Sequence, residues 1–131
     1  MRYLAAALAF ALTLTPALAQ SDVSDRLQML SSRINADLPY RSPWGAVTST
    51  YVDGNVLVWN ATLNSAFIRA VGHNGVLEDF RKNTCNTSEF RRIIENYGVT
   101  FRMIAVAKSG QQYVSDANRQ TCVGAFGSIF P

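Results

Sequence analysis

The chain is organised around residues 85–122, which read CNTSEFRRIIENYGVTFRMIAVAKSGQQYVSDANRQTC and hold both cysteines of the protein, Cys85 and Cys122. Between the cysteines, the pattern predicts one helix, a glycine that ends it and a β-hairpin. In an oxidising compartment, two cysteines are expected to form a disulfide, which would close all of these elements into one loop. A loop of this length adds about 4 kcal/mol of stability in the chain-entropy model. The alternative that stays open is a pair of buried free thiols.

Residues 1–19 have the composition of a secretory signal peptide. A single positive charge at Arg2 precedes an apolar run over residues 4–14, and small residues precede an expected cut after Ala19. The run is shorter than the roughly 20 residues that a membrane-spanning helix needs, and a retained N-terminal anchor is the alternative. No cysteine directly follows the cut, where Gln20 stands, so the lipid-anchored type of bacterial export signal is absent. We therefore expect residues 20–131 to form one soluble domain, periplasmic or secreted, with no stable membrane insertion.

Composition and charge exclude several classes of function. Cleavage would remove one of the 12 basic residues, Arg2, and none of the 9 acidic ones, so the net charge falls from +3 to +2. This charge is too small to indicate a nucleic-acid partner or a polybasic membrane patch. The cysteines are too far apart for a CxxC redox motif, and with a single histidine they provide too few ligands for a structural zinc site. We expect no metal and no cofactor.

The N-terminal half predicts a helix followed by a hairpin. Apolar residues at steps of three and four over residues 21–37 predict an amphipathic helix that ends before Pro39. It packs on the sheet or, as the alternative, binds a partner. Residues 46–52 and 55–63 are strand-like, and Asp53-Gly54 is a strong two-residue turn between them.

This turn predicts which side chains share a face of the hairpin. Val52 would pair with Asn55, and the pairs further out would follow in step. One face would then carry Leu57, Trp59, Ala61 and Leu63 together with Thr50, Thr48 and Ala46, and we expect it to lie against the helices. The opposite face, which includes Tyr51 and Val58, is not fully polar. It is either partly covered or a binding surface.

The C-terminal half predicts helices and a second hairpin. A helix that starts at Asn64 or Ser65 is interrupted at residues 72–75, Gly-His-Asn-Gly, and resumes towards Cys85. The next helix begins at Asn86, where Glu89 completes a variant capping box, and Gly98 ends it.

The second hairpin consists of a strand over residues 99–108, a Ser109-Gly110 turn and a return strand from Gln111 to Val114. The strand pattern weakens over residues 115–121, and the apolar tail 123–131 either packs on the body or frays. The full order of helix, hairpin, two or three helices and hairpin predicts an α+β domain. Its antiparallel sheet, built from the two hairpins, is packed against helices.

No motif indicates catalysis. His73, the only histidine, lies in a predicted turn and has no signature of a nucleophile or supporting carboxylate. The carboxylates fall at helix caps and exposed helix positions, where capping and solvation explain them, although the spacing of a catalytic pair is a property of the fold. We expect a protein that is not an enzyme.

Aromatic and basic side chains are the candidates for partner binding. Tyr40 and Trp44, in a proline-flanked connector, are expected to be exposed, whereas Trp59 is expected in the core. Arg91 and Arg92, with two further basic residues before Cys85, form a modest basic cluster. The cluster is either a solvated helix face or an anion-binding site.

Several short features together resemble a group of small exported bacterial proteins. These features are Leu38-Pro39, the hairpin around Asp53-Gly54, the helix with Cys85, Gly98 before a strand, Ser109-Gly110, and Cys122 at the end of the last strand. On this basis the chain resembles the quorum-sensing-regulated virulence factor family and, more distantly, periplasmic pilotin-like α/β proteins of secretion systems. The resemblance implies an α+β fold, one disulfide, a periplasmic location and no catalytic residues.

Two functions are compatible with these observations. The first is a soluble exported protein without enzymatic activity that binds a protein partner in the cell envelope, such as a secretion component. The alternative is an envelope hydrolase or an inhibitor of a cell-wall hydrolase. An enzyme would require several acids, or His73, to converge in a cleft.

Overall fold

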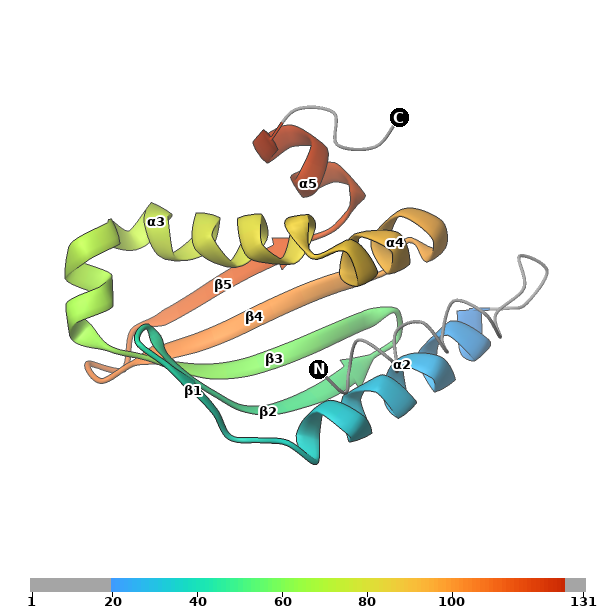
Figure 1. The fold of residues 1–131 in the computed structure, drawn as a ribbon, viewed down its shortest axis with the longest axis horizontal. Helices are drawn as coiled ribbons and strands as arrows, with labels where there is room; N and C mark the ends of the chain where they lie inside the picture. The colour runs from blue at the N-terminus through green and yellow to red at the C-terminus, as the bar shows by residue number, and fades with distance from the viewer. Residues whose placement is uncertain (1–19, 127–131) are drawn as a thin grey trace.

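The computed structural model describes residues 20–126, and it confirms the predicted α+β class (Figure 1). The predicted signal peptide, residues 1–19, and the end of the apolar tail, residues 127–131, lie outside the described residues. In chain order the elements are α2 (Gln20–Asn35), β1 (Tyr40–Ser42), β2 (Gly45–Asp53), β3 (Val56–Leu63), α3 (Ser65–Asn86), α4 (Ser88–Tyr97), β4 (Thr100–Ala107), β5 (Gln112–Ala117) and α5 (Arg119–Phe126). Within residues 20–126, no helix combines the length and the apolar character that crossing a bilayer requires.

The five strands form one sheet in the order β1-β2-β3-β4-β5. Both predicted hairpins are present as antiparallel pairs, β2–β3 and β4–β5, and β1 adds a short antiparallel edge. The central pair, β3–β4, is parallel, with Val56 opposite Thr100 and Leu63 opposite Ala107. A parallel pair needs a long crossover connection, and α3 and α4 provide it. The sheet is therefore antiparallel except where the two hairpins meet.

The turn of the first hairpin lies one residue later than predicted. Asp53 pairs with Val56, so Gly54-Asn55 forms the two-residue loop and the whole register shifts by two positions. Of the two loop residues, only Gly54 has a positive φ, of 63°. A positive φ at the first loop residue alone is typical of a type II′ turn. Since the shift is even, Leu57 and Trp59 keep the face that the sequence predicts.

An irregularity in β2 changes which of its side chains lie on the face of Leu57 and Trp59. The register shifts between Val47 and Ser49, as in a β-bulge. Beyond this point Val47, rather than Thr48, lies opposite Ala61 and on the same face as Trp59. The expectation that Thr48 and Ala46 share this face was therefore wrong.

The helices pack on one face of the sheet, which we call the inner face (Figure 1). It carries Leu57 and Trp59 of β3 and Phe101 and Met103 of β4. The apolar stripe of α2 that the sequence predicts is buried against it: Val23, Leu27, Leu30 and Ile34. We call the opposite face of the sheet the outer face. Among the described residues, the helix residues of the two core clusters pack on the inner face.

In the two crossover helices, the effects predicted for the glycines are observed, but the predicted capping box is not. Within α3, Gly72 has non-helical angles (φ 76°, ψ 174°), so the predicted interruption is a kink. The start of α4 is not a capping box, because Thr87 is the N-cap and its side chain makes no cap hydrogen bond. Gly98 ends α4 in the left-handed conformation, as predicted, and its N–H donates to the Ile94 carbonyl.

The last strand is longer than the sequence pattern indicates. β5 continues to Ala117 because its polar side chains have partners: the Ser115 hydroxyl donates to the Leu77 carbonyl at 2.8 Å, and Asp116 pairs with Arg102. Residues 119–126 then form α5 rather than an irregular tail.

The helix α5 is capped by Asn118 and Thr121, and it contains Cys122. The Asn118 N–H donates to the Thr121 hydroxyl, and the Thr121 N–H donates to the Asn118 side-chain oxygen. Cys122 therefore lies in a helix, not at the end of a strand as the resemblance implied. The predicted disulfide to Cys85 is confirmed, with 5.6 Å between the Cα atoms and both residues fully buried. It ties α5 to α3.

Candidate functional site

One concave feature of the described residues is an apolar groove between α3 and the β1–β2 hairpin. A cavity of about 210 Å³ is lined by Trp44, Val47, Trp59, Ala61, Leu63, Phe67, Val76, Asp79, Phe80, Asn83 and Met103. A second cavity of about 150 Å³ shares Trp59, Phe80 and Asn83 with the first and extends to Thr84, Thr87 and Phe90. Because they share three lining residues, the two cavities adjoin, and we call them together the α3 groove.

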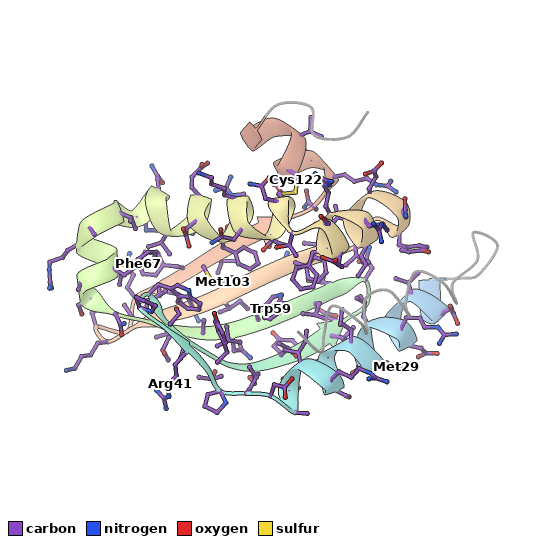
Figure 2. All side chains as sticks on the ribbon, viewed as in Figure 1. Met29, Arg41, Trp59, Phe67, Met103 and Cys122 are labelled. Carbon is purple, nitrogen blue, oxygen red and sulfur yellow. A yellow bond between two sulfur atoms is a disulfide. The ribbon has the colours of Figure 1, made fainter. Side chains whose placement is uncertain are left out.

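The floor and walls of the α3 groove come from different parts of the chain. Figure 2 shows Phe67, Met103 and Trp59 in the space between α3 and the strands. Trp59 and Met103 form the floor on β3 and β4, whereas Trp44 and Val47 form the wall opposite α3. The groove exists because α2 packs over β2 and one end of β3, while α3 packs over β4 and β5. The inner face between the two helices is left partly bare.

Trp59 is the central residue of this floor. Its ring meets Phe90 of α4 edge to face, with 6.0 Å between the ring centroids. Its indole N–H is buried and has no hydrogen-bond partner among the described residues. The side chain is half-buried and packs against the core, so the expectation of a core residue is met in part. A half-buried tryptophan in an aromatic cluster is a typical anchor surface for a partner.

The polar groups of the α3 groove are few and lie on one side. Asp79 and Asn83 are one turn apart on α3, and the Asn83 amide donates to the Asp79 carboxylate at 3.2 Å. Asp79 is the only charged residue that lines the two cavities. The groove therefore presents a largely apolar channel with a single negative charge on the α3 wall, and it suits an apolar segment that carries a basic residue.

The predicted binding residues divide between this groove and other surfaces. Trp44 is half-buried and lines the groove, and Tyr40, opposite Val47 in the β1–β2 register, is exposed at its margin. Arg91 and Arg92 lie on α4 and line neither cavity. The connector is therefore next to the groove, and the two arginines are not part of it.

The described residues do not bring His73 or several acids together in the groove. His73 is exposed beside the kink of α3, and its ring contacts that of Tyr113, with 5.0 Å between centroids. Within the described part of the chain, no group of three or more histidine, cysteine or acidic side chains could hold a metal ion. The two cavities are lined by one carboxylate, that of Asp79, and by the hydroxyls of Thr84 and Thr87.

The outer face of the sheet contains one well-formed ion pair. The Arg102 guanidinium donates two hydrogen bonds to the Asp116 carboxylate, at 2.7 and 3.0 Å. These hydrogen bonds, together with the negative charge of Asp116, raise the pKa of Arg102. Since both side chains are about one-third exposed, the pair contributes little to stability.

Several groove residues could not be identified from the sequence. Phe67 and Phe80 belong to an apolar helix stripe, and such a stripe normally means core. The only available signal is the concentration of aromatic residues, which are enriched at interfaces, in the segments that meet here. Whether an apolar stripe is covered depends on how far apart α2 and α3 lie on the sheet, and no local pattern encodes that distance.

Comparisons with known proteins identify the fold. No family model matches the chain, and no curated protein matches it in sequence. Among solved structures, the pilotin EpsS of the Vibrio vulnificus type 2 secretion system superposes with a TM-score of 0.71 and 14% identity, over 79% of this chain and 94% of that one. The type II secretion system pilotin AspS of Vibrio cholerae gives 0.70 and 15%, over the same shares of the two chains.

A third structure, a secreted protein of Pseudomonas aeruginosa, has a TM-score of 0.68 and 13% identity, over 82% of this chain and 99% of that one. At these identities the likeness concerns the fold alone. The chain therefore has a fold similar to that of pilotins, and the resemblance to pilotin-like α/β proteins is confirmed at this level.

Proposed function

We propose that this chain is a periplasmic or secreted protein without enzymatic activity that binds an envelope component through the α3 groove. The component that the fold favours is part of a secretion system, because two of the similar structures are pilotins of type 2 secretion systems. The predicted signal peptide and the disulfide support an oxidising, extracytoplasmic location. The relation to quorum-sensing-regulated virulence factors stays a prediction.

The observation that carries the proposal is the set of half-buried aromatic side chains that line the groove: Trp44, Trp59, Phe67 and Phe80. Aromatic side chains in a concave, mostly apolar site provide the large contact areas on which partner binding depends. Because the two adjoining cavities are both lined by residues of α3, the groove suits an extended or helical apolar segment. Asp79 on the α3 wall would pair with a lysine or arginine of that segment.

The experiment is photocrosslinking from within the groove in the exporting cell. A benzoylphenylalanine at position 67 replaces Phe67 on the groove wall, and the same residue at position 29 replaces the exposed Met29 of α2 as a control. We expect one major covalent partner from position 67, identified by mass spectrometry, and none from position 29. The same partner from both positions, or none from either, would contradict the proposal.

A charge-reversal pair tests the role of Asp79. Asp79→Lys places a positive charge on the groove wall, whereas Glu78→Lys makes the same change at the neighbouring exposed position outside the groove. We expect Asp79→Lys to weaken crosslinking from position 67 at least about tenfold, and Glu78→Lys to leave it within about twofold. Equal effects would show that the net charge of α3, rather than the groove, controls binding.

The alternative function, an inhibitor of a cell-wall hydrolase, would use the same groove. The identity of the crosslinked protein separates it from the secretion role. A hydrolase captured by position 67, and inhibited by the purified chain but not by Asp79→Lys, would favour the inhibitor.

A further inference from the structure

The two edges of the sheet are protected to different degrees. Beyond the three residues of β1, the edge of β2 is capped at Thr50, where the Asn35 side chain bonds both backbone groups. An exposed strand edge is a template for pairing with another chain, and proteins commonly block it in this way. At the opposite edge, no side chain of the described residues forms such hydrogen bonds with the backbone of the first half of β5.

The hydrogen bonds around β5 show which backbone groups face this edge. The Ala107 N–H donates to the Gln111 carbonyl at 2.9 Å, so Gln111 and every second residue after it direct their backbone groups to β4. Gln112, Val114 and Asp116 therefore direct theirs away from β4. The Asp116 carbonyl accepts a hydrogen bond from the Thr121 hydroxyl at 2.9 Å. For Gln112 and Val114, the described residues provide no such partner.

Exposed valines lie beside this open stretch, and the strands β4 and β5 carry no net charge. Val114 is 49% exposed and Val106, on the neighbouring strand, is 37% exposed, both on the outer face. The only charged residues within β4 and β5 are Arg102 and Asp116, and they neutralise each other. Two identical surfaces repel each other when they carry net charge, and this one does not.

We infer that β5 pairs with β5 of a second copy of this chain. The two strands run antiparallel about a two-fold axis at Tyr113, with Gln112 of each copy opposite Val114 of the other. In this register the outward N–H and C=O groups of both residues are satisfied reciprocally, as a two-fold interface requires. The five-stranded sheet becomes one continuous sheet across the two copies, and the exposed valines of the outer faces adjoin.

This pairing leaves the α3 groove available. The groove opens on the inner face between α3 and the β1–β2 hairpin, whereas the paired edge lies at the opposite side of the sheet. A dimer formed through β5 thus carries two independent grooves. A segment of a different protein adding to β5 is the competing occupant, and the experiments below distinguish it.

Amide hydrogen exchange and sedimentation of the purified exported chain test the inference. At high concentration we expect a dimer in which the amides of Gln112 and Val114 are protected, and dilution to the monomer should increase their exchange at least about tenfold. The amides of Tyr113 and Ser115, which bond to β4, should stay protected at both concentrations. A monomer at every concentration, or fast exchange at Gln112 and Val114 throughout, would overturn the inference.

Two substitutions at one position test the geometry. Val114→Pro removes the outward N–H without touching a hydrogen bond to β4, and Val114→Lys places a charge on the edge. Both should raise the dimer dissociation constant at least about tenfold, while Tyr51→Lys, at an exposed position on the β2 side of the same face, should leave it unchanged. Circular dichroism verifies that each variant is folded.

Two outcomes of these experiments would overturn the inference. A dimer that withstands both folded Val114 variants assembles through another surface and overturns the inference. So does a monomeric chain whose photocrosslinker at Val114 captures a different protein, since the occupant would then be a foreign strand.

Discussion

The carboxamide of Asn35 pairs with both backbone groups of Thr50. The Thr50 N–H donates to the side-chain oxygen at 2.8 Å, and the Asn35 amide donates to the Thr50 carbonyl at 3.0 Å. The Thr50 hydroxyl, in turn, lies 2.6 Å from the Ser31 hydroxyl. A side chain from the last turn of α2 thus takes the place of a neighbouring strand residue, and it fixes the helix along the edge of β2.

We expect Asn35→Ala to lower the free energy of unfolding by about 2 kcal/mol, because it leaves a partly buried N–H and C=O without partners. Asn74→Ala, at an exposed position of α3, is the matched control and should change stability by less than about 0.5 kcal/mol. Urea unfolding measures both variants. Equal effects would mean that the Asn35 pairing contributes nothing specific.

The disulfide between Cys85 and Cys122 should contribute about 4 kcal/mol, since it constrains a loop with a sequence separation of 37. Urea unfolding of the Cys85→Ala, Cys122→Ala double variant measures the loss. Mass spectrometry after alkylation under non-reducing conditions should find no free thiol in the exported chain. Two alkylated cysteines in the folded protein would contradict the bond.

Gly45 should tolerate no side chain. A Cβ there would lie 2.0 Å from the Thr62 carbonyl oxygen, and the φ of 154° is unfavourable for other residues. We expect Gly45→Ala to cost more than about 3 kcal/mol, whereas Gly110→Ala, where φ is also positive but nothing lies within 4 Å, should cost about 1 kcal/mol. Thermal and urea unfolding compare the two. Similar losses would show that φ, rather than the clash, dominates at Gly45.

Both tryptophans of the protein line the α3 groove, so intrinsic fluorescence should report its occupancy. The apolar dye anilinonaphthalene sulfonate, bound in the groove, should quench the emission of Trp44 and Trp59 by energy transfer. Phe67→Asp should weaken dye binding about tenfold, because it places a charge on an apolar wall, while Met29→Asp should not. Unchanged binding to Phe67→Asp would place the dye elsewhere.

Local structure was predictable where one residue type determines it. The interruption at Gly72, the end of α4 at Gly98 and the hairpin around Gly54 follow from backbone conformations that glycine favours. The α2 stripe followed from its period. These features need no information from distant parts of the chain.

Features that depend on distant partners were not predictable. The strand pattern weakens at Ser115 and Asp116, but both belong to β5, where Leu77 of α3 and Arg102 of β4 satisfy their side chains. The irregularity at Thr48 reverses which β2 residues face inward, and no single residue signals it. The α3 groove is likewise a gap between two helices, so sequence patterns identified some of its residues without identifying the site.

The parallel β3–β4 pair determines when the chain can complete its sheet. Strand β3 ends at Leu63, but its neighbour on the far side is complete only at Ala107. In the export that we propose, with the N-terminus crossing first, β3 would emerge with one flank unpaired until the whole crossover has followed. During that interval Leu57, which is fully buried in the folded protein, would be accessible to chaperones and proteases. The length of that exposure would be set by how soon β4 follows.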